Sequence, residues 1–369
     1  MRLLLLTALA ITIILGLHSC KEEFTVSAPY KEITVVAGIL GRSDTAHYIR
    51  IQKAFMDENK SAITMSKEAD SSFYQDLVVK LYEYDSAQTK ALDSIELYRV
   101  DLNQEGYKKL DPVNDQQFFT NPNYAYKFKD NQWASNHKLN PRLWYKLNIH
   151  NKKTSRTDSS EYVGIVNSDS NRTYDGFFIP DFNSAQYTLS FAKTTANARY
   201  RLFAYMPRNG RMAEGYIRFN YIDKNIVTNE KIRKHVDYAF DNELTVTKGG
   251  QSFELTTLNS NIYGFLNSSI GPAPDNIERY LDSCDLFIYG AGPELYYYNT
   301  INQGQTGGLT GDNIQPNYTN FKGNDVIGVL SSRGMRSYYN VPIEKATLDS
   351  LMFTNTATTP LRIRGMSED

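Results

Sequence analysis

The chain has 369 residues, a formal net charge of -1 and 22% charged residues. These values are typical of an ordinary globular protein. They exclude a disordered chain, and also a nucleic-acid-binding protein, which would need a basic excess. The unusual component is tyrosine, with 27 residues beside 18 phenylalanines. Because aromatic side chains fit a pleated, half-buried surface, this excess predicts first a β-rich fold and second a platform that binds sugars or proteins.

The N-terminus has the pattern of a secretory signal. Met1 and Arg2 give a short positive start, and residues 3–17 form an apolar run that is too short for a membrane span of about 20 residues. Residues 1–19 are therefore predicted to be a signal peptide. The segment Leu17-His18-Ser19-Cys20 resembles a bacterial lipobox, although His18 departs from the usual small or aliphatic residue. The resemblance implies cleavage before Cys20 and a lipid on its thiol. The alternative is an ordinary secretory signal with an incidental cysteine.

Residues 20–30 are predicted to be a lipidated tether. Lys21, Glu22 and Glu23 follow the cysteine directly, and in Bacteroidota-type lipoproteins an acidic stretch at this place resembles the export signal to the outer face of the outer membrane. The resemblance implies a lipid-anchored outer-membrane protein that faces the cell exterior, and the alternative is a solvated tether that carries no address. The mature chain keeps one other cysteine, Cys284, which is predicted to be a small buried hydrophobe.

Period-two alternation predicts seven short strands in the first half of the chain. They cover residues 33–40, 48–52, 77–84, 95–102, 124–128, 143–149 and 162–166. Their number and spacing predict an immunoglobulin-like sandwich over residues 31–170. The strand entered at Pro141 through Tyr145 resembles the Tyr-x-Leu-x-Ile/Val strand near the end of such domains. Residues 151–160 contain no apolar side chain and are predicted to be a hairpin loop.

A polar stretch at 167–175 places the domain boundary near residue 170, and residues 171–369 are predicted to be a larger β-rich domain. Its first strands are expected at 186–191, 199–205 and 215–222. Helical pieces are expected near Asn229–Val236 and Pro293–Ile301, and the glycine-rich segment 303–313 is expected to be a mobile loop. The predicted fold class is thus mainly β, an N-terminal immunoglobulin-like sandwich followed by a larger β-rich domain with one or two short helices.

Three tyrosines of the second predicted helix, Tyr296, Tyr297 and Tyr298, are candidate partner-contacting residues. The alternative is that their rings pack the helix on the sheet.

Four tripeptides match a permissive motif, Asp followed by Ser or Thr and then an aliphatic or similar residue, which resembles the O-glycosylation motif of Bacteroidota surface proteins. The candidate O-glycosylation sites are Thr45, Ser86, Ser94 and Ser350. The alternative is that they are plain turn residues.

Several features together carry a resemblance over most of the mature chain. They are the lipobox, the strand-rich N-terminal half, residues 286–289 followed by 293–296, and residues 318–321 leading into 328–332. The chain resembles Bacteroidota outer-membrane lipoproteins of unknown function, which are often encoded beside TonB-dependent transporters. The resemblance implies an immunoglobulin-like domain and a β-rich domain on the cell surface, docked on an outer-membrane β-barrel or transporter. It supplies no catalytic residues.

The sequence contains no nucleophile-elbow Gly-x-Ser-x-Gly, no phosphate-binding glycine-rich loop with lysine, and no His-Glu-x-x-His. The histidines have no metal-ligand spacing, so no metal and no cofactor are expected, and the protein is predicted not to be an enzyme. Asp282 with Asp285 is a candidate carboxylate pair, although acidic neighbours are common in any sequence. Two functions stay open: a binding or scaffolding subunit of an outer-membrane complex, in nutrient uptake or beside a β-barrel, and a surface enzyme that processes glycans or peptides. A lipoprotein that only binds a glycan lies between them.

Overall fold

The computed structural model describes residues 31–56, 65, 67–109, 119–168, 176, 177, 179, 187–193, 195, 197–240, 245–304 and 318–366. The predicted signal peptide, Cys20 and the tether lie outside these residues. Strands dominate the described chain, which confirms the prediction of a mainly β fold. In this part of the chain, no helix has both the length and the apolar character needed to cross a membrane.

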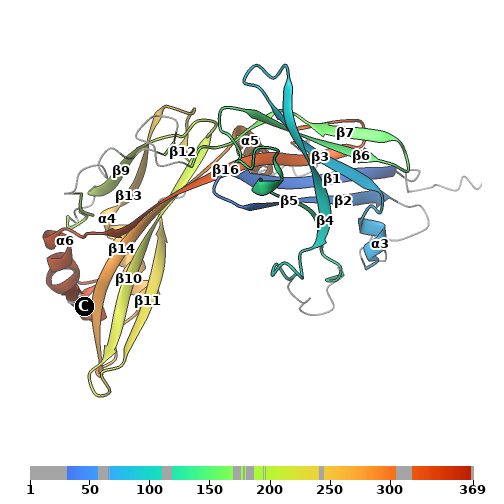
Figure 1. The fold of residues 1–369 in the computed structure, drawn as a ribbon. Helices are drawn as coiled ribbons and strands as arrows, with labels where there is room; N and C mark the ends of the chain where they lie inside the picture. Colours follow the sequence, from blue (N-terminus) through green and yellow to red (C-terminus); the bar gives the residue numbers. More distant parts are fainter. Residues whose placement is uncertain are drawn as a thin grey trace, which may run out of the picture.

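The N-terminal lobe is a sandwich of two sheets (Figure 1). Its strands are β1 (Lys31–Gly41), β2 (Ala46–Met56), β3 (Leu77–Tyr84), β4 (Ala91–Asp101), β5 (Tyr124–Lys129), β6 (Trp144–Asn151), β7 (Arg156–Ser160) and β8 (Val163–Gly164). Two short helical turns accompany them, α3 (Ala69–Ser72) and a 3-10 turn at Asp130–Gln132. One sheet has the order β1, β2, β5, β4, and the other has the order β3, β6, β7.

Strand β4 belongs to both sheets of this lobe. Its first part, up to Leu97, pairs with β3, and Tyr98–Asp101 pair with β5. With β1 to β7 taken as strands A to G, the two sheets are ABED and CFG, the order of an immunoglobulin-like sandwich. Alternate apolar side chains of the two sheets face each other in the core, as the period-two pattern predicts. The predicted immunoglobulin-like sandwich is therefore confirmed.

Tyr145 fixes the start of β6. Its hydroxyl accepts a hydrogen bond from the backbone N–H of Asn140 at 2.7 Å and donates one to Glu83 at 2.6 Å. The ring is fully buried and lies 5.9 Å from the ring of Trp133. A tyrosine in this place that bonds back to the upstream backbone is the tyrosine corner of immunoglobulin-like domains. Burial raises the pKa of Tyr145, so the hydroxyl keeps its proton and donates to Glu83.

The prediction of a loop over 151–160 is wrong for its second half. Residues 152–155 form the hairpin turn, but Arg156–Ser160 form strand β7. The strand has no apolar side chain, yet Asp158 and Ser160 are buried, and each forms a hydrogen bond there. Arg156 donates to Asp158 at 3.0 Å, and the Ser160 hydroxyl accepts the N–H of Leu147 at 2.9 Å. Polar pairing replaces the hydrophobic alternation by which strands are usually found in a sequence.

The C-terminal part of the chain returns to complete the N-terminal lobe. Strand β15 (Phe321–Lys322) pairs with β7, and the first half of β16 (Val326–Val341) pairs in parallel with β1. The two backbones are so close at Gly328 that a Cβ there would lie 2.0 Å from the carbonyl oxygen of Val36. Residues 318–333 thus pack with the first lobe, so a single boundary near residue 170 does not separate the two lobes.

The C-terminal lobe is a long sheet with the order β11, β10, β14, β16, covered on one side (Figure 1). The strands are β10 (Met212–Asn225), β11 (Lys231–Ala239), β14 (Ile277–Ala291) and the second half of β16, with the short strands β12 (Thr245–Val246) and β17 (Ile363–Met366) beside them. The cover consists of a two-stranded sheet of β9 (Arg199–Tyr205) and β13 (Ser252–Leu258), called the cover sheet, with α4 (Asn259–Ile270), α6 (Lys345–Asp349), a π-helical turn at Ser350–Thr354 and a 3-10 turn at Thr359–Leu361.

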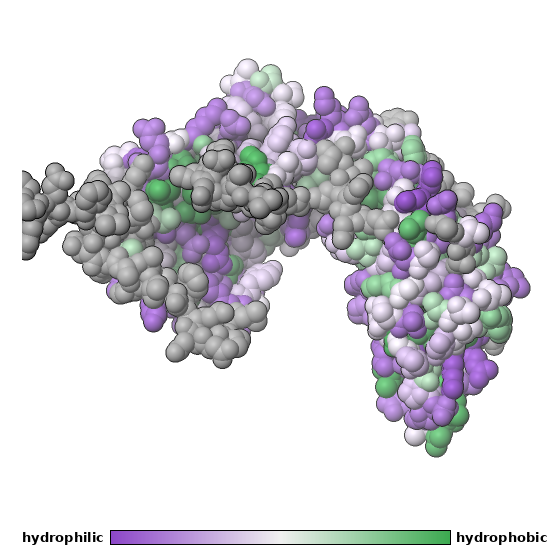
Figure 2. Space-filling view, turned by 180° about the vertical axis from the view of Figure 1, so that it is seen from behind, coloured by the Kyte–Doolittle hydropathy of each residue, from purple (hydrophilic) through white to green (hydrophobic). Residues whose placement is uncertain are grey.

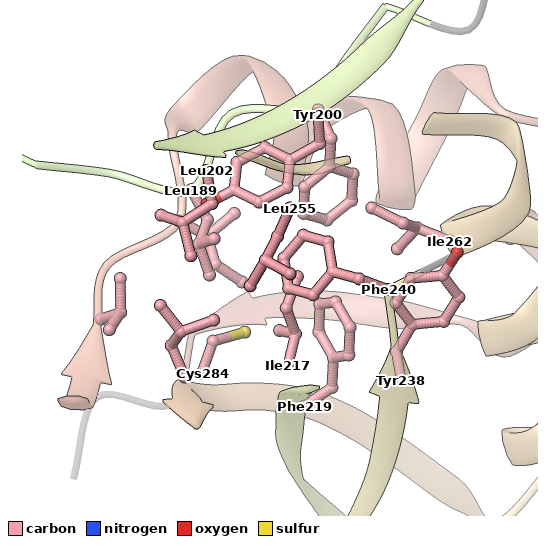
Figure 3. Close-up of a cluster of buried hydrophobic side chains, with 14 of the residues drawn as sticks. Leu189, Tyr200, Leu202, Ile217, Phe219, Tyr238, Phe240, Leu255, Ile262 and Cys284 are labelled. Carbon is pink, nitrogen blue, oxygen red and sulfur yellow. The ribbon is translucent and has the colours of Figure 1, made fainter. Parts of the chain in front are cut away.

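Apolar side chains of the sheet and its cover form the core of this lobe (Figure 3). Ile217 and Phe219 of β10 face Leu202 and Leu255 of the cover sheet. Cys284 of β14 is fully buried in the same cluster, and burial raises the pKa of its thiol. The prediction that Cys284 is a small buried hydrophobe is confirmed.

The predicted helix over Asn229–Val236 is wrong, because this segment lies in β11. Most side chains of β11 are exposed, since it is the edge strand and pairs with β10. The predicted helix at Pro293–Ile301 is confirmed as α5 (Pro293–Gly304). Helix α4 was not predicted. Its residues Ile262, Tyr263 and Leu266 are buried, so one side of the helix faces the core. The expected strand at 186–191 is reduced, among its described residues, to a bridge of Leu189 to Ile343.

Candidate binding surface

Arg333 marks the point at which β16 passes from one lobe to the other. It pairs with Gly41 of β1 on one edge of the strand and with Ala291 of β14 on the other edge. Because side chains alternate along a strand, Arg333 and Met335 lie on the same side of β16. This side runs from the N-terminal sheet into the C-terminal sheet. We call it, together with the side chains beside it on β1, β2, β4, the loop after β4, β5, β10, β11 and β14, the shared face.

Large apolar side chains are exposed along the shared face. They are Ile39, Tyr98, Tyr107, Tyr289, Met335 and Tyr339. The two most exposed, Tyr339 at 65% and Tyr107 at 59%, lie on different lobes. The molecule is hollowed between its lobes, and apolar side chains interrupt the polar surface of the side seen in Figure 2. Exposed apolar side chains that gather on one side of a protein, among polar groups, are typical of interaction sites.

On the N-terminal lobe, the shared face contains a hollow of about 740 Å³. The apolar part of its lining includes Ile39, Leu102 and Tyr107, and the polar part includes Arg50 and Arg333. Arg333 forms an ion pair with Asp44, another lining residue, at 3.3 Å.

The wall of this hollow is braced at Tyr48. Its hydroxyl donates to Glu105 at 2.9 Å, and its ring meets the ring of Tyr107 edge-on at 5.4 Å. Lys127 also donates to the carboxylate of Glu105, and these hydrogen bonds lower the pKa of Glu105. The wall is therefore held in place by groups that neutralise one another.

On the C-terminal lobe, the shared face carries a row of stacked aromatic and charged groups. Arg218 donates two hydrogen bonds of 2.7 Å to Asp237, and its guanidinium lies 5.1 Å from the ring of Phe287. Phe287 in turn contacts Tyr339 edge-on at 6.0 Å. The hydrogen bonds from Arg218 lower the pKa of Asp237. Bidentate pairing and stacking fix the guanidinium plane, so this part of the face is preorganised.

A second hollow, of about 440 Å³, lies beside this row. Both members of the candidate carboxylate pair, Asp282 and Asp285, line it, together with His235 and Tyr339. Asp285 is only 8% exposed. It accepts the side-chain amide of Asn220 and the backbone N–H of Asn340, each at 3.0 Å. Asp285 thus orders the floor of the hollow, whose polar groups can bind a hydroxylated ligand.

The three tyrosines of α5 line neither hollow. The ring of Tyr296 lies 5.3 Å from the guanidinium of Arg211, and Tyr297 lies 5.8 Å from Tyr318. Tyr297 and Tyr298 are exposed. One ring of the triplet therefore packs on the protein, and the other two are accessible at its surface.

The start of α5 is held on β16. The hydroxyl of Ser331 donates to the carboxylate of Glu294 at 2.9 Å and accepts the N–H of Leu295 at 3.3 Å. Burial raises the pKa of Glu294, because a charged carboxylate would be desolvated there. The adjacent Ser332 donates to the carbonyl of Gly164 at 2.6 Å, so two neighbouring serines tie α5 and β8 to the crossing.

The candidate O-glycosylation sites divide by exposure. Thr45, Ser86 and Ser94 are exposed, and Thr45 also lines the larger hollow. Ser350 is buried, and its hydroxyl faces the carbonyl of Ala192 at 3.5 Å. A glycan cannot be attached to a buried hydroxyl of the folded protein, so Ser350 does not fit this role. Cys20, the predicted lipid attachment site, lies outside the described residues.

Within the described ranges, no three His, Cys, Asp or Glu side chains lie close enough together to hold a metal ion. His47 is buried beside Phe128, with ring centroids 4.4 Å apart, and its Nε2 lies 3.1 Å from Asp130. Burial lowers the pKa of His47, which keeps the imidazole neutral. Neither protein-family models nor curated proteins gave a match to this chain.

The shared face was not found from the sequence. Its residues come from strands that are far apart in the chain, and strand order cannot be read from period-two alternation. One signal was present in the sequence. Arg333, Met335 and Tyr339 of β16 follow one another at spacings of two and four residues, and side chains at such spacings lie on the same side of a strand.

Proposed function

We propose that this protein is a surface-anchored lipoprotein that acts as a binding or scaffolding subunit of an outer-membrane complex, either in nutrient uptake or beside a β-barrel. The observation that carries the proposal is the shared face, which crosses from one lobe to the other on the single strand β16. A partner on this face would contact both lobes at once, and its position would be fixed by one continuous backbone. An exposed aromatic surface of this kind supports binding better than it supports chemistry.

The predicted anchor is consistent with such a role. A lipid on Cys20 would hold the N-terminal lobe to the membrane through the tether up to Lys31, which spans at most roughly 40 Å when extended. A single lipidated cysteine with a short tether keeps the shared face within reach of proteins in the same membrane. The proposed location is the outer membrane, with the lobes facing the cell exterior.

Mild detergent extraction and purification of the intact lipoprotein from its native host tests the proposal. We expect an outer-membrane β-barrel protein to co-purify, and we expect Tyr339→Ala to reduce its yield. Phe203→Ala is the matched control, because Phe203 is an exposed aromatic residue on the cover sheet, away from the shared face. A wild-type chain that always runs alone would contradict the proposal.

A second candidate function is supported by the smaller hollow. Asp282 and Asp285 line it beside Tyr339, an arrangement that suits a bound sugar and, with two carboxylates, glycan or peptide hydrolysis. Activity on a glycan and peptide panel that is lost in Asp282→Asn would favour this enzyme. Glycan binding without turnover would favour a glycan-binding lipoprotein.

A further inference from the structure

Arg50 is a half-buried cation in the larger hollow. Its guanidinium donates a hydrogen bond of 2.6 Å to the neutral amide oxygen of Asn123. Within the part of the chain that the structure describes, no carboxylate forms an ion pair with it, whereas the other arginine of the hollow, Arg333, is paired with Asp44 at 3.3 Å. Burial lowers the pKa of Arg50, as expected for a cation without an opposing charge. The hydrogen-bond partner of this half-buried guanidinium is thus a neutral amide.

A second cation increases the positive potential around Arg50. Lys109 lies on the loop after β4, where its ammonium donates to the carbonyl of Phe119 at 3.1 Å and lies 4.3 Å from the Phe119 ring. Burial lowers the pKa of Lys109, and the charge of Arg50 lowers it further. Two acids near the hollow are already engaged: Glu105 accepts hydrogen bonds from Lys127 and Tyr48, and Asp44 is paired with Arg333. The site therefore has unbalanced positive charge.

The rest of the hollow suits an apolar body. Ile39, Leu102 and the Tyr107 ring line it, and Tyr107 is 59% exposed although it leans on Tyr48. The volume of about 740 Å³ lies in the range of small-molecule sites, which are mostly apolar with a few placed polar groups. One unpaired guanidinium beside an apolar lining is complementary to one anionic group on an apolar molecule.

We propose that this hollow binds a small amphipathic anion, a molecule with one carboxylate, sulfonate or phosphate group on an apolar or aromatic body. Arg50 holds the anionic group, and Ile39, Leu102 and Tyr107 pack on the body. The hollow can be filled whether or not the shared face docks on a β-barrel, so this proposal and the proposed function can fail separately.

Calorimetric titration of the intact lipoprotein with 2-naphthoate, 2-naphthalenesulfonate and 2-naphthyl phosphate tests the site, with protein-free detergent as the blank. The neutral counterpart is 2-naphthalenemethanol, which has the same ring without the charge. We expect at least one anion to bind at one site. Arg50→Gln should weaken that binding about 10-fold or more, because a hydrogen bond to a charged group is lost, and should leave the neutral alcohol unchanged.

Two further variants keep the test decisive. Arg333→Gln is the matched control in the same hollow and should change the affinity by less than about 3-fold, since Arg333 is already paired. Ile39→Glu leaves Arg50 intact but adds an opposing carboxylate, and it should abolish anion binding even if Arg50→Gln proves unstable in thermal melts. Binding of the anions to both Arg50→Gln and Ile39→Glu with wild-type affinity would overturn the proposal. So would the failure of all three anions to bind the wild type.

Competition identifies the source of the anion. Displacement of the bound naphthalene anion by water-soluble dihexanoyl phosphatidylglycerol, but not by hexanoate, would indicate a lipid head group. The reverse result would indicate a free organic acid.

Discussion

Arg333 of β16 lies opposite Gly41 of β1 at the last paired position of their parallel ladder. Beyond this position β16 pairs with β14 of the second lobe, so the two lobes share a strand. The geometry of this strand sets how the two parts of the shared face lie relative to each other. Changes in the ladder should therefore affect both stability and partner binding.

Gly328→Ala should damage this ladder. Gly328 has a φ of 144°, and a Cβ there would lie 2.0 Å from a backbone oxygen of β1, which cannot move aside. We expect a loss of about 2 kcal/mol or more in the free energy of unfolding, measured with urea. Gly264→Ala is the control, because a Cβ at that position in α4 meets nothing within 4 Å. It should be neutral or stabilise the protein by up to about 1 kcal/mol. Equal effects of the two variants would contradict the described ladder.

Much of the N-terminal lobe was predictable because its signals are local. Alternation places Val79 and Leu81 on one side of β3, and the strand begins and ends where predicted. Tyr145 likewise sits in a local pattern typical of the fold. The pairing of β16 with β1 and the position of Arg50 in a hollow could not be predicted, because both depend on contacts between distant segments. For β11 the sequence misleads, because an edge strand exposed on both sides has no apolar alternation to distinguish it from a helix.

Asp223→Asn should destabilise the protein strongly. Asp223 accepts Arg279 at 2.7 Å and Lys234 at 2.9 Å, and the side chains of Asp223 and Arg279 are almost fully buried. Removing the carboxylate would leave the Arg279 charge buried and uncompensated, which costs about 3–5 kcal/mol. Asp237→Asn breaks the exposed pair with Arg218 and should cost less than about 1 kcal/mol. Urea unfolding of both variants measures the difference, and a larger loss in Asp237→Asn would contradict this account.

Glu294→Gln should stabilise the protein at neutral pH. Burial raises the pKa of Glu294 above its ordinary value of 4.5, so the folded state binds this proton more tightly than the unfolded state. The charged carboxylate therefore costs stability at neutral pH, and this cost disappears as the pH falls through the raised pKa to below 4.5. Glutamine can still accept the hydrogen bond from Ser331. Unfolding free energies of the two proteins should differ at pH 7 and converge in acid, and a variant that is less stable at pH 7 would contradict this assignment.

Glycosylation, if the native host applies it, should follow exposure. We expect mass shifts on peptides that contain Thr45, Ser86 or Ser94, and none on the peptide that contains Ser350, because that hydroxyl is buried. Intact-protein and peptide mass spectrometry of material from the native host measures this. A glycan on Ser350 would show that modification precedes folding.

The central claim is that one partner covers the shared face on both lobes. Site-specific photo-crosslinking in the native membrane tests it most directly, with benzoyl-phenylalanine placed in turn at Tyr107, Tyr339 and, as the control, Phe203. These are exposed aromatic positions on the strands or loops of the N-terminal lobe, on the C-terminal sheet and on the cover sheet. We predict that Tyr107 and Tyr339 crosslink to the same outer-membrane protein and that Phe203 does not. Crosslinks from Phe203 alone, or from neither Tyr107 nor Tyr339, would contradict the claim.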